Sequence, residues 1–154
     1  MGSAVSPPRV YLDSNVFMAA FEHVGAHSDH AWWILDAVQS REIVGGTSEM
    51  TLAEVLVKPA QLGYAELASA YETMLVQGPN FEMLSVNRSI LVKAAGIRAR
   101  RTSVRLPDAV HMATAEALSC PIFVSEGRSP ALPEGMRLLP VNPFTLDDIL
   151  EQRT

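Results

Sequence analysis

The sequence predicts an α/β domain in which helices cover both faces of a mainly parallel sheet. Short apolar runs alternate along the chain with stretches of helical period, which is the order typical of βαβ units. The 154 residues are 48% hydrophobic and 19% charged, so the chain can bury a core of ordinary size. We expect residues 1–8 to form a flexible lead-in and residues 9–154 to form a single domain.

The first half of the chain begins with an apolar run that ends on a charge, "VYLD" at 10–13. Phe17, Ala20 and Phe21 then recur at helical spacing and predict a helix over 14–23. A second strand is expected at 41–48. Further helices are expected over 27–40, capped by Ser28 or Asp29, over 49–59, stopped by Pro59, and over 63–79, closed by Gly78 and Pro79.

The second half repeats the alternation of strands and helices. Apolar runs predict strands at 81–86, 121–125 and 136–141. Asn87 is a suitable cap for a helix over 87–101, and Pro107 suits the first turn of a helix over 106–120. A short helix over 145–153 completes the chain.

Composition excludes several classes of protein. The formal net charge of −5 argues against a protein that coats nucleic acid without specificity. No apolar run approaches the roughly 20 residues that span a bilayer, and residues 1–9 lack the features of a signal peptide. The single Cys120 cannot form an internal disulfide and is expected to pack in the core, which fits a reducing cytoplasm.

Four acids lie where a parallel sheet would form a reactive crevice. Asp13 ends the first predicted strand, Glu54 lies in the helix after the second, Asp108 lies in the first turn of the 106–120 helix, and Glu126 follows the 121–125 strand. Carboxylates that converge repel one another unless a cation neutralises them, and Mg²⁺ and Mn²⁺ favour oxygen ligands. Such ions can activate water and stabilise the leaving oxygen of a phosphodiester.

Each acid also has a plainer interpretation. Asp13 and Asp108 could be helix N-terminal acids favoured by the helix dipole. Glu54 could be a solvated helix residue, and Glu49 competes for its role.

The segments "VYLDSNVF", "TLAEVLVKP", "LPDAVHMATA" and "IFVSEGRS", in this order, resemble those of the PIN-domain family, in particular the VapC-like ribonuclease toxins. The resemblance implies a three-layer α/β/α fold and an endoribonuclease that depends on Mg²⁺ or Mn²⁺. It also implies an RNA substrate, a homodimer and a small VapB-like antitoxin. Asp13, Glu54 and Asp108 become the metal-binding acids, with Ser14 or Asn15 as their polar neighbour.

The chain departs from the family after the fourth strand, where the family often has Thr-x-Asp. Here Ser125 is followed by Glu126, and Gly127 stands where the Asp would fall. Either Glu126 supplies the fourth ligand, directly or through water, or that ligand is missing. We expect Glu126 to face the site, because the chain leaves strand geometry at Ser125.

Basic residues precede Asp108 in "IRARRTSVR". Arginine forks suit phosphate oxygens, so these residues could guide RNA to the acids, although cations also favour the C-terminal end of a helix. We expect RNA phosphate contacts from Arg98, Arg101, Arg105 and Arg128.

Histidines raise two further possibilities. His23, His27 and His30 could suggest a zinc site, but Gly25 interrupts their helical spacing, and a surface loop is the favoured interpretation. His111 lies three residues after Asp108 and could orient that acid, although a satisfied core histidine is the commoner case.

Two other functions compete with a metal-dependent ribonuclease. One is a non-catalytic PIN-like module that binds RNA or protein and has a degraded metal site. The other is an α/β phosphatase or response-regulator-like protein that uses Asp13 as a phosphoacceptor. That class needs a lysine near the acid, and neither Lys58 nor Lys93 follows a strand end.

Overall fold

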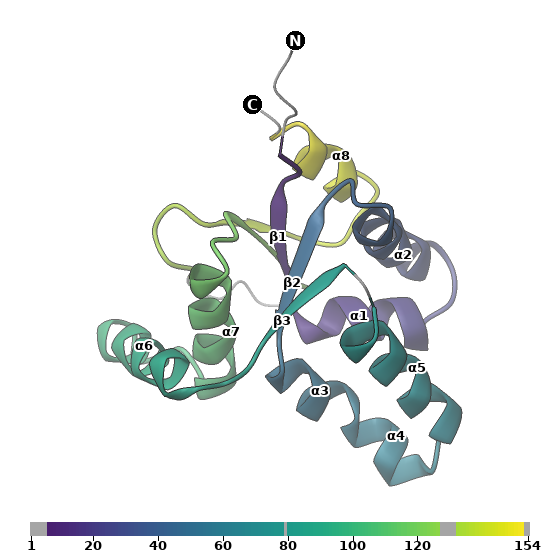
Figure 1. Ribbon diagram of the computed structural model, residues 1–154, viewed down its shortest axis with the longest axis horizontal. Helices are drawn as coiled ribbons and strands as arrows, with labels where there is room; N and C mark the ends of the chain where they lie inside the picture. The colour runs from purple at the N-terminus through teal and green to yellow at the C-terminus, as the bar shows by residue number, and fades with distance from the viewer. Residues whose placement is uncertain (1–5, 79, 127–131, 153–154) are drawn as a thin grey trace.

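The computed structural model describes residues 6–78, 80–126 and 132–152. Within this part of the chain all strand pairs of a five-stranded sheet are parallel, in the order β3-β2-β1-β4-β5 (Figure 1). The strands are β1 (Arg9–Leu12), β2 (Val44–Ser48), β3 (Phe81–Leu84), β4 (Ile122–Val124) and β5 (Arg137–Leu139). The predicted parallel α/β sheet is therefore confirmed.

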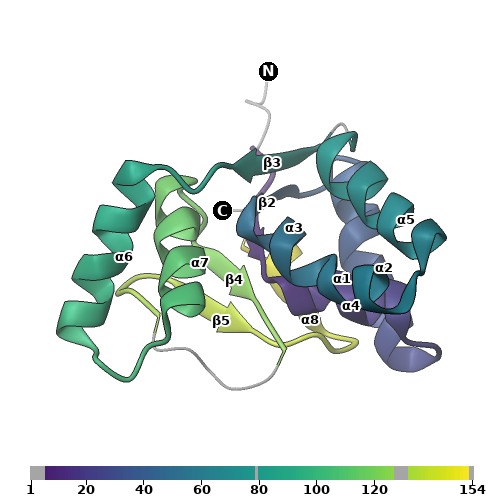
Figure 2. The same ribbon diagram turned by 90° about the horizontal axis from the view of Figure 1, so that it is seen from below.

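Helices cover both faces of the sheet, which gives the three layers expected of a PIN-like fold. The helices are α1 (Ser14–Glu22), α2 (Ala26–Gln39), α3 (Met50–Val55), α4 (Val57–Leu62), α5 (Ala65–Val76), α6 (Arg88–Arg100), α7 (Leu106–Ala117) and α8 (Thr145–Leu150). Figure 2 shows α6 and α7 on one side, and α1, α2, α4 and α5 on the other. None of the helices in the described ranges is long and apolar enough to cross a membrane.

The alternation of side chains along β1 supplies both cores. Val10 and Leu12 join the cluster formed with α1, α2 and α5, whereas Tyr11 joins Ala115 and Phe123 in a cluster beneath α7. Successive strand residues point to opposite faces, so a four-residue strand can serve both layers. Because β1 is buried on both sides, its carboxyl end holds the next residue, Asp13, firmly at the edge of the sheet.

The strand order places a switch point at this edge. From β1 the chain winds through β2 to the β3 edge, and it later returns to the other side of β1 as β4. The connections leaving β1 and β4 therefore diverge, which opens a crevice outside their carboxyl ends. The backbone N–H of Asp13 donates to the carbonyl of Val124 across this pair at 3.1 Å.

Two predicted helix ends are wrong. Pro59 does not stop a helix but lies in the first turn of α4, where a missing N–H costs nothing; the break comes at Leu56. Neither Ser28 nor Asp29 caps α2, because Gly25, at φ +101°, is the N-cap residue. Ser28 is buried instead, and its hydroxyl donates to the carbonyl of Ala20 at 3.0 Å.

Other local predictions are confirmed. Asn87 caps α6 by accepting a hydrogen bond from the N–H of Ile90 at 3.0 Å, and Pro107 lies in the first turn of α7. Cys120 is buried at 3% exposure, and burial raises the pKa of its thiol to about 11. It packs as a small apolar residue in the cluster beneath α7.

Candidate metal centre

Asp13 is both a helix cap and the fixed point of the site. One carboxylate oxygen, Oδ1, accepts the N–H of Ser14 at 2.8 Å and so caps α1. The other, Oδ2, accepts the hydroxyl of Ser125 at 2.8 Å. The carboxylate is therefore oriented from two strands, β1 and β4, while 15% of the side chain remains exposed. The plainer interpretation, a capping acid, is confirmed, and a metal-binding role for Asp13 stays a prediction.

Glu54 approaches Asp13 from α3, which follows β2. The position of α3 is set by Thr47 at the end of β2, which donates to the carbonyl of Leu12 at 2.8 Å and shares a second 2.8 Å hydrogen bond with Thr51. These buried hydroxyls tie the start of α3 to the end of β1. Glu54, and not Glu49 at the N-cap position of α3, belongs to the group of possible ligands in the described part of the chain.

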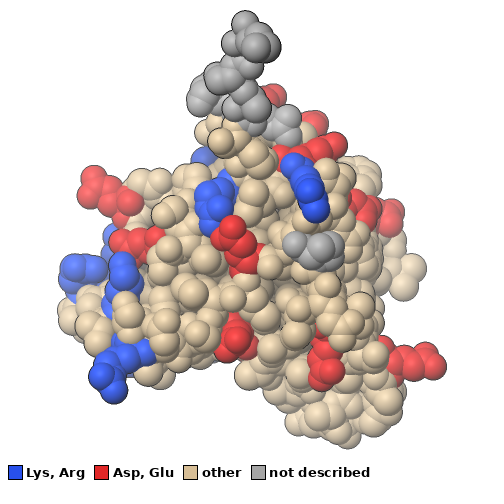
Figure 3. All heavy atoms as spheres, viewed as in Figure 1, with Lys and Arg blue, Asp and Glu red and all other residues tan. Residues whose placement is uncertain are grey.

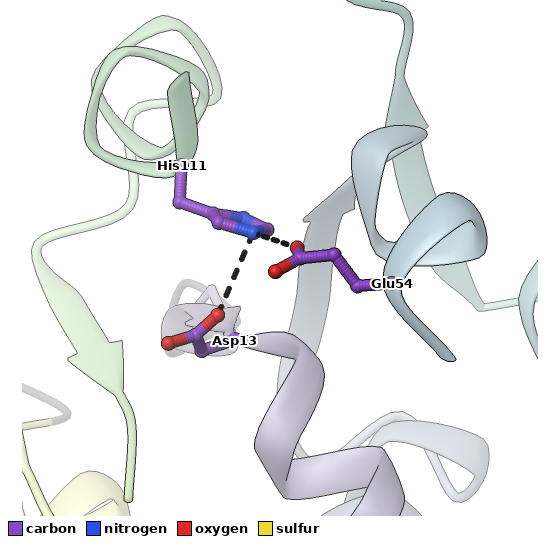
Figure 4. Close-up of side chains that lie close together, drawn as sticks. All are labelled: Asp13, Glu54 and His111. Carbon is purple, nitrogen blue, oxygen red and sulfur yellow. Dashed lines mark hydrogen bonds and ion pairs between the residues drawn. The ribbon is translucent and has the colours of Figure 1, made fainter. Parts of the chain in front are cut away.

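His111 joins the two acids, as Figure 4 shows. Its Nε2 lies 2.5 Å from Oε1 of Glu54 and 3.6 Å from Oδ1 of Asp13, and its Nδ1 lies 2.6 Å from the hydroxyl of Tyr11. Burial alone would lower the pKa of His111, but the hydrogen bond to Glu54 and the charges of Asp13, Glu54 and Asp108 raise it overall. A single ligand atom from each of Asp13, Glu54 and His111 lies within 4.8 Å of the other two.

The commoner interpretation from sequence, a satisfied core histidine, is confirmed, because His111 is buried at 2% exposure and both of its ring nitrogens have partners. The sequence did not predict that the side chain also contacts Glu54 and Asp13. The usable signal was its spacing: one turn after Asp108 on a helix that packs over the end of β1.

Asp108 lies at the rim of the same centre. It is exposed in the first turn of α7, one turn before His111. Partial burial and the charge of Asp13 raise its pKa, against the smaller opposing effects of His111 and Arg105. The pKa of Asp108 therefore depends on the charges of the other acids, although Asp108 is not part of the group formed by Asp13, Glu54 and His111.

Glu126 points elsewhere. Its Oε1 accepts the N–H of Val141 at 2.7 Å, and its Oε2 lies 3.5 Å from Nε2 of His27. The preceding residue, Ser125, is the one whose side chain meets Asp13, and successive side chains of an extended segment point to opposite faces. This direction differs from the one expected, and a role for Glu126 as a ligand stays a prediction. Gly127 lies outside the described residues.

The predicted supporting residues have distinct positions. Asn15 makes two hydrogen bonds to the backbone of Glu126, just after β4. Its Oδ1 accepts the N–H of Glu126 at 3.0 Å, and its Nδ2 donates to the carbonyl of Glu126 at 2.6 Å. Ser14 is buried beside Asp13. The hydroxyl of Ser125 donates a hydrogen bond directly to the Asp13 carboxylate. These contacts fix the two chain segments that leave β1 and β4.

Three of the four predicted RNA contacts, Arg98, Arg101 and Arg105, lie on the α6 and α7 side, where Figure 3 shows Lys and Arg side chains gathered over the α6 end. Arg98 donates to the carbonyl of Val104 at 3.1 Å, and Arg105 occupies the N-cap position of α7. Arg101, with Arg100, lines an open hollow of about 350 Å³. Arg128 lies outside the described residues, and RNA contact by this set stays a prediction.

The chemistry of the central donors fits a divalent cation. Two carboxylates that come from different elements face one point, and an imidazole nitrogen faces the same point. Carboxylate oxygens suit Mg²⁺ and Mn²⁺, and imidazole suits transition metals. Among the described residues no other group of three or more such side chains comes this close, so His23, His27 and His30 form no comparable cluster.

Comparisons with known proteins agree with the fold. The family model described as "PIN domain" matches residues 10–131. A toxin–antitoxin complex from Klebsiella pneumoniae is similar in structure, with a TM-score of 0.62 at 17% identity over 84% of this chain and 95% of that chain. VapBC2 from Rickettsia felis, bound to a promoter DNA fragment, gives 0.61 at 13% identity over 86% and 98%. FitAcB from Neisseria gonorrhoeae gives 0.58 at 20% identity over 75% and 86%. None of the curated proteins matches the sequence.

The electrostatics of the centre predict that Asp108→Asn raises the melting temperature of the metal-free protein at pH 7 by a few degrees. The pKa of Asp108 is raised on folding, so its ionised form costs stability at neutral pH. Such a carboxyl favours the fold below its unfolded pKa and loses that contribution as the pH rises through the folded pKa. The gain should therefore be present at pH 7 and fade as both states become protonated in acid.

Asp13→Asn is the matched control for this measurement. Asp13 caps α1 and lies beside His111, so its neutral analogue should give no comparable gain. Thermal denaturation of both variants in EDTA, followed by circular dichroism, compares them. An equal rise for both, or a fall for Asp108→Asn, would contradict the assigned electrostatics.

Proposed function

The chain belongs to the PIN domain family, and from this premise we propose that it is an endoribonuclease that depends on Mg²⁺ or Mn²⁺. We further propose that it acts in the cytoplasm as the toxin of a VapBC-type pair. The observation that carries the proposal is the meeting of Asp13 and Glu54 at the carboxyl edge of the sheet, with Asp108 close enough to sense their charge. Carboxylates placed this close suit a cation, which would neutralise their like charges.

The side chains of the centre have separable tasks in this proposal. A bound divalent cation would supply an activated water and would neutralise charge on the phosphodiester. Asp13, Glu54 and Asp108 would hold it, and the hydroxyl of Ser125 keeps Asp13 oriented. Arg98, Arg101, Arg105 and Arg128 would bind flanking RNA phosphates, because guanidinium groups pair well with phosphate oxygens.

We expect Asp13→Asn and Asp108→Asn each to lower RNA cleavage by about 10²-fold or more, since each removes a negative charge that would hold the cation. The measurement is cleavage of a mixed RNA substrate with Mn²⁺ or Mg²⁺, with parallel reactions in EDTA. Asp36→Asn removes an exposed carboxylate on α2 and should cleave as the wild type does. Full cleavage in excess EDTA, or wild-type rates for both site variants, would refute the proposal.

The structural neighbours support a proposal about partners. The similar structures are described as a toxin–antitoxin complex, as VapBC2 and as FitAcB. By analogy we propose that this chain binds a small VapB-like antitoxin, and from the family resemblance we propose that it forms a homodimer.

Light scattering should then give twice the 16.7 kDa mass of the chain. Co-expression with the small reading frame beside its gene should give a stable complex and restore growth. A strict monomer that is harmless when expressed alone would contradict both parts.

A second candidate function is a non-catalytic PIN-like module that binds RNA or protein. The observation that favours it is the carboxylate of Glu126, which bonds to Val141 and faces His27 away from the other acids. In this alternative the fourth acidic ligand is absent and the site has lost activity.

Glu126→Gln bears on both candidates. Gln keeps the Oε1 acceptor for the N–H of Val141, so we expect the fold and the cleavage rate to stay within about twofold of wild type. The comparison variant is Ser125→Ala, which removes the hydrogen bond to Asp13 and should lower cleavage. A sharp loss with Glu126→Gln, together with weaker Mn²⁺ binding, would make Glu126 the fourth ligand. An inactive wild type would favour the binding module.

A further inference from the structure

We propose that His111 is a nitrogen ligand of the metal centre, so that the site takes an imidazole together with the carboxylates of Asp13 and Glu54 and prefers Mn²⁺ to Mg²⁺. This inference rests on the metal centre of the proposed function. It adds a donor of a different chemical kind to a set that the sequence predicted to be entirely acidic.

The burial of His111 is the first argument. The side chain is 2% exposed on a helix whose inward residues are otherwise mostly apolar, yet its Nε2 faces the polar edge of the sheet. Carboxylates from two other elements, Asp13 after β1 and Glu54 on α3, approach Nε2 of this ring (Figure 4). Nε2 is thus the third of three possible ligand atoms, together with one carboxylate oxygen each from Asp13 and Glu54.

The hydroxyl of Tyr11 gives the second argument. It lies 2.6 Å from Nδ1 and belongs to a fully buried ring that stacks on Phe123 at a centroid distance of 4.9 Å. A histidine that binds a metal usually donates its other ring N–H to a fixed acceptor, which sets the tautomer and the ring orientation. With a proton on Nδ1, His111 donates to the oxygen of Tyr11. In the metal-free protein Nε2 carries a second proton, which it donates to Glu54, and a bound cation would take the place of that second proton.

Spacing gives the third argument. Ligand atoms that share one cation lie about 3 Å apart when each is about 2.1 Å from the ion. Nε2 lies 3.6 Å from Oδ1 of Asp13, which is close to this value, and 2.5 Å from Oε1 of Glu54, which is a direct hydrogen bond. For a cation to bind, Nε2 has to lose the proton that it donates to Glu54, and Glu54, whose side chain is 33% exposed, has to withdraw slightly.

A nitrogen ligand changes the selectivity of the centre. Mg²⁺ binds oxygen donors and keeps several waters, whereas imidazole suits the transition metals. With His111 as a ligand, the centre should bind Mn²⁺ more tightly than Mg²⁺ by a margin that depends on this one residue.

Pulsed electron paramagnetic resonance of the Mn²⁺-loaded full chain tests the proposal without reference to activity. Wild type should show the ¹⁴N coupling of a coordinated imidazole, replaced by a ¹⁵N coupling after labelling with ¹⁵N-histidine. His111→Gln should lose the coupling, and calorimetry should show its Mn²⁺ affinity falling about tenfold or more while its Mg²⁺ affinity changes less. His27→Gln, at an exposed position, should retain the nitrogen coupling and the Mn²⁺ affinity of the wild type.

A variant that keeps the core intact guards against unfolding of His111→Gln. The chain has four histidines, so replacing His23, His27 and His30 with Gln leaves His111 as the sole source of a histidine signal. A nitrogen coupling that persists in that triple variant supports the proposal, and bound Mn²⁺ without a nitrogen coupling overturns it.

The two proposals fail separately. Metal-dependent RNA cleavage without nitrogen coupling would overturn the ligand role of His111 and leave the ribonuclease standing. Bound Mn²⁺ that shows the nitrogen coupling but supports no RNA cleavage would overturn the ribonuclease and leave the ligand role of His111 standing. A chain that binds no Mn²⁺ would overturn both.

Discussion

The central constraint in this structure is the close approach of two carboxylates that the fold brings together. Asp13 and Glu54 come from different βα units, and each lies close to Nε2 of His111. Like charges at this separation are costly without an opposite charge between them. The elements that carry the three residues, the end of β1, α3 and α7, are held together by buried hydrogen bonds.

A layer of buried hydroxyl groups lies next to the charged side chains of the centre and supports them. Tyr11, Thr47 and Thr51 are fully buried, and their hydroxyls find partners in His111, in the carbonyl of Leu12 and in each other. Among the described residues no buried side-chain nitrogen or oxygen lacks a hydrogen-bond partner. Because an unpaired polar group would be expensive in this position, the network also restricts where β2 and α7 can lie relative to β1.

The sequence was sufficient to predict the elements whose signals are local. Hydrophobic period predicted the sheet and its helices, and the run from Val10 to Asp13 predicted a charge at a strand end. Failures came where the outcome depends on distant residues. Pro59 looked like a stop because the break at Leu56 has no sequence mark. The direction of the Glu126 side chain is set by its contacts with Val141 and His27. The orientation of the His111 ring is set by a hydrogen bond to Tyr11, 100 residues away.

The pairing of β1 with β4 has a consequence for synthesis of the chain. Asp13 is made well before its partner Ser125, which lies 112 positions later, and β4 itself must insert beside β1. Contacts this far apart in sequence form late, because closing the intervening loop costs entropy before any contact offsets it. Until β4 has been made, Asp13 lacks the strand and the Ser125 hydroxyl that hold it. The carboxylate of Asp13 therefore takes its final orientation only after β4 has inserted.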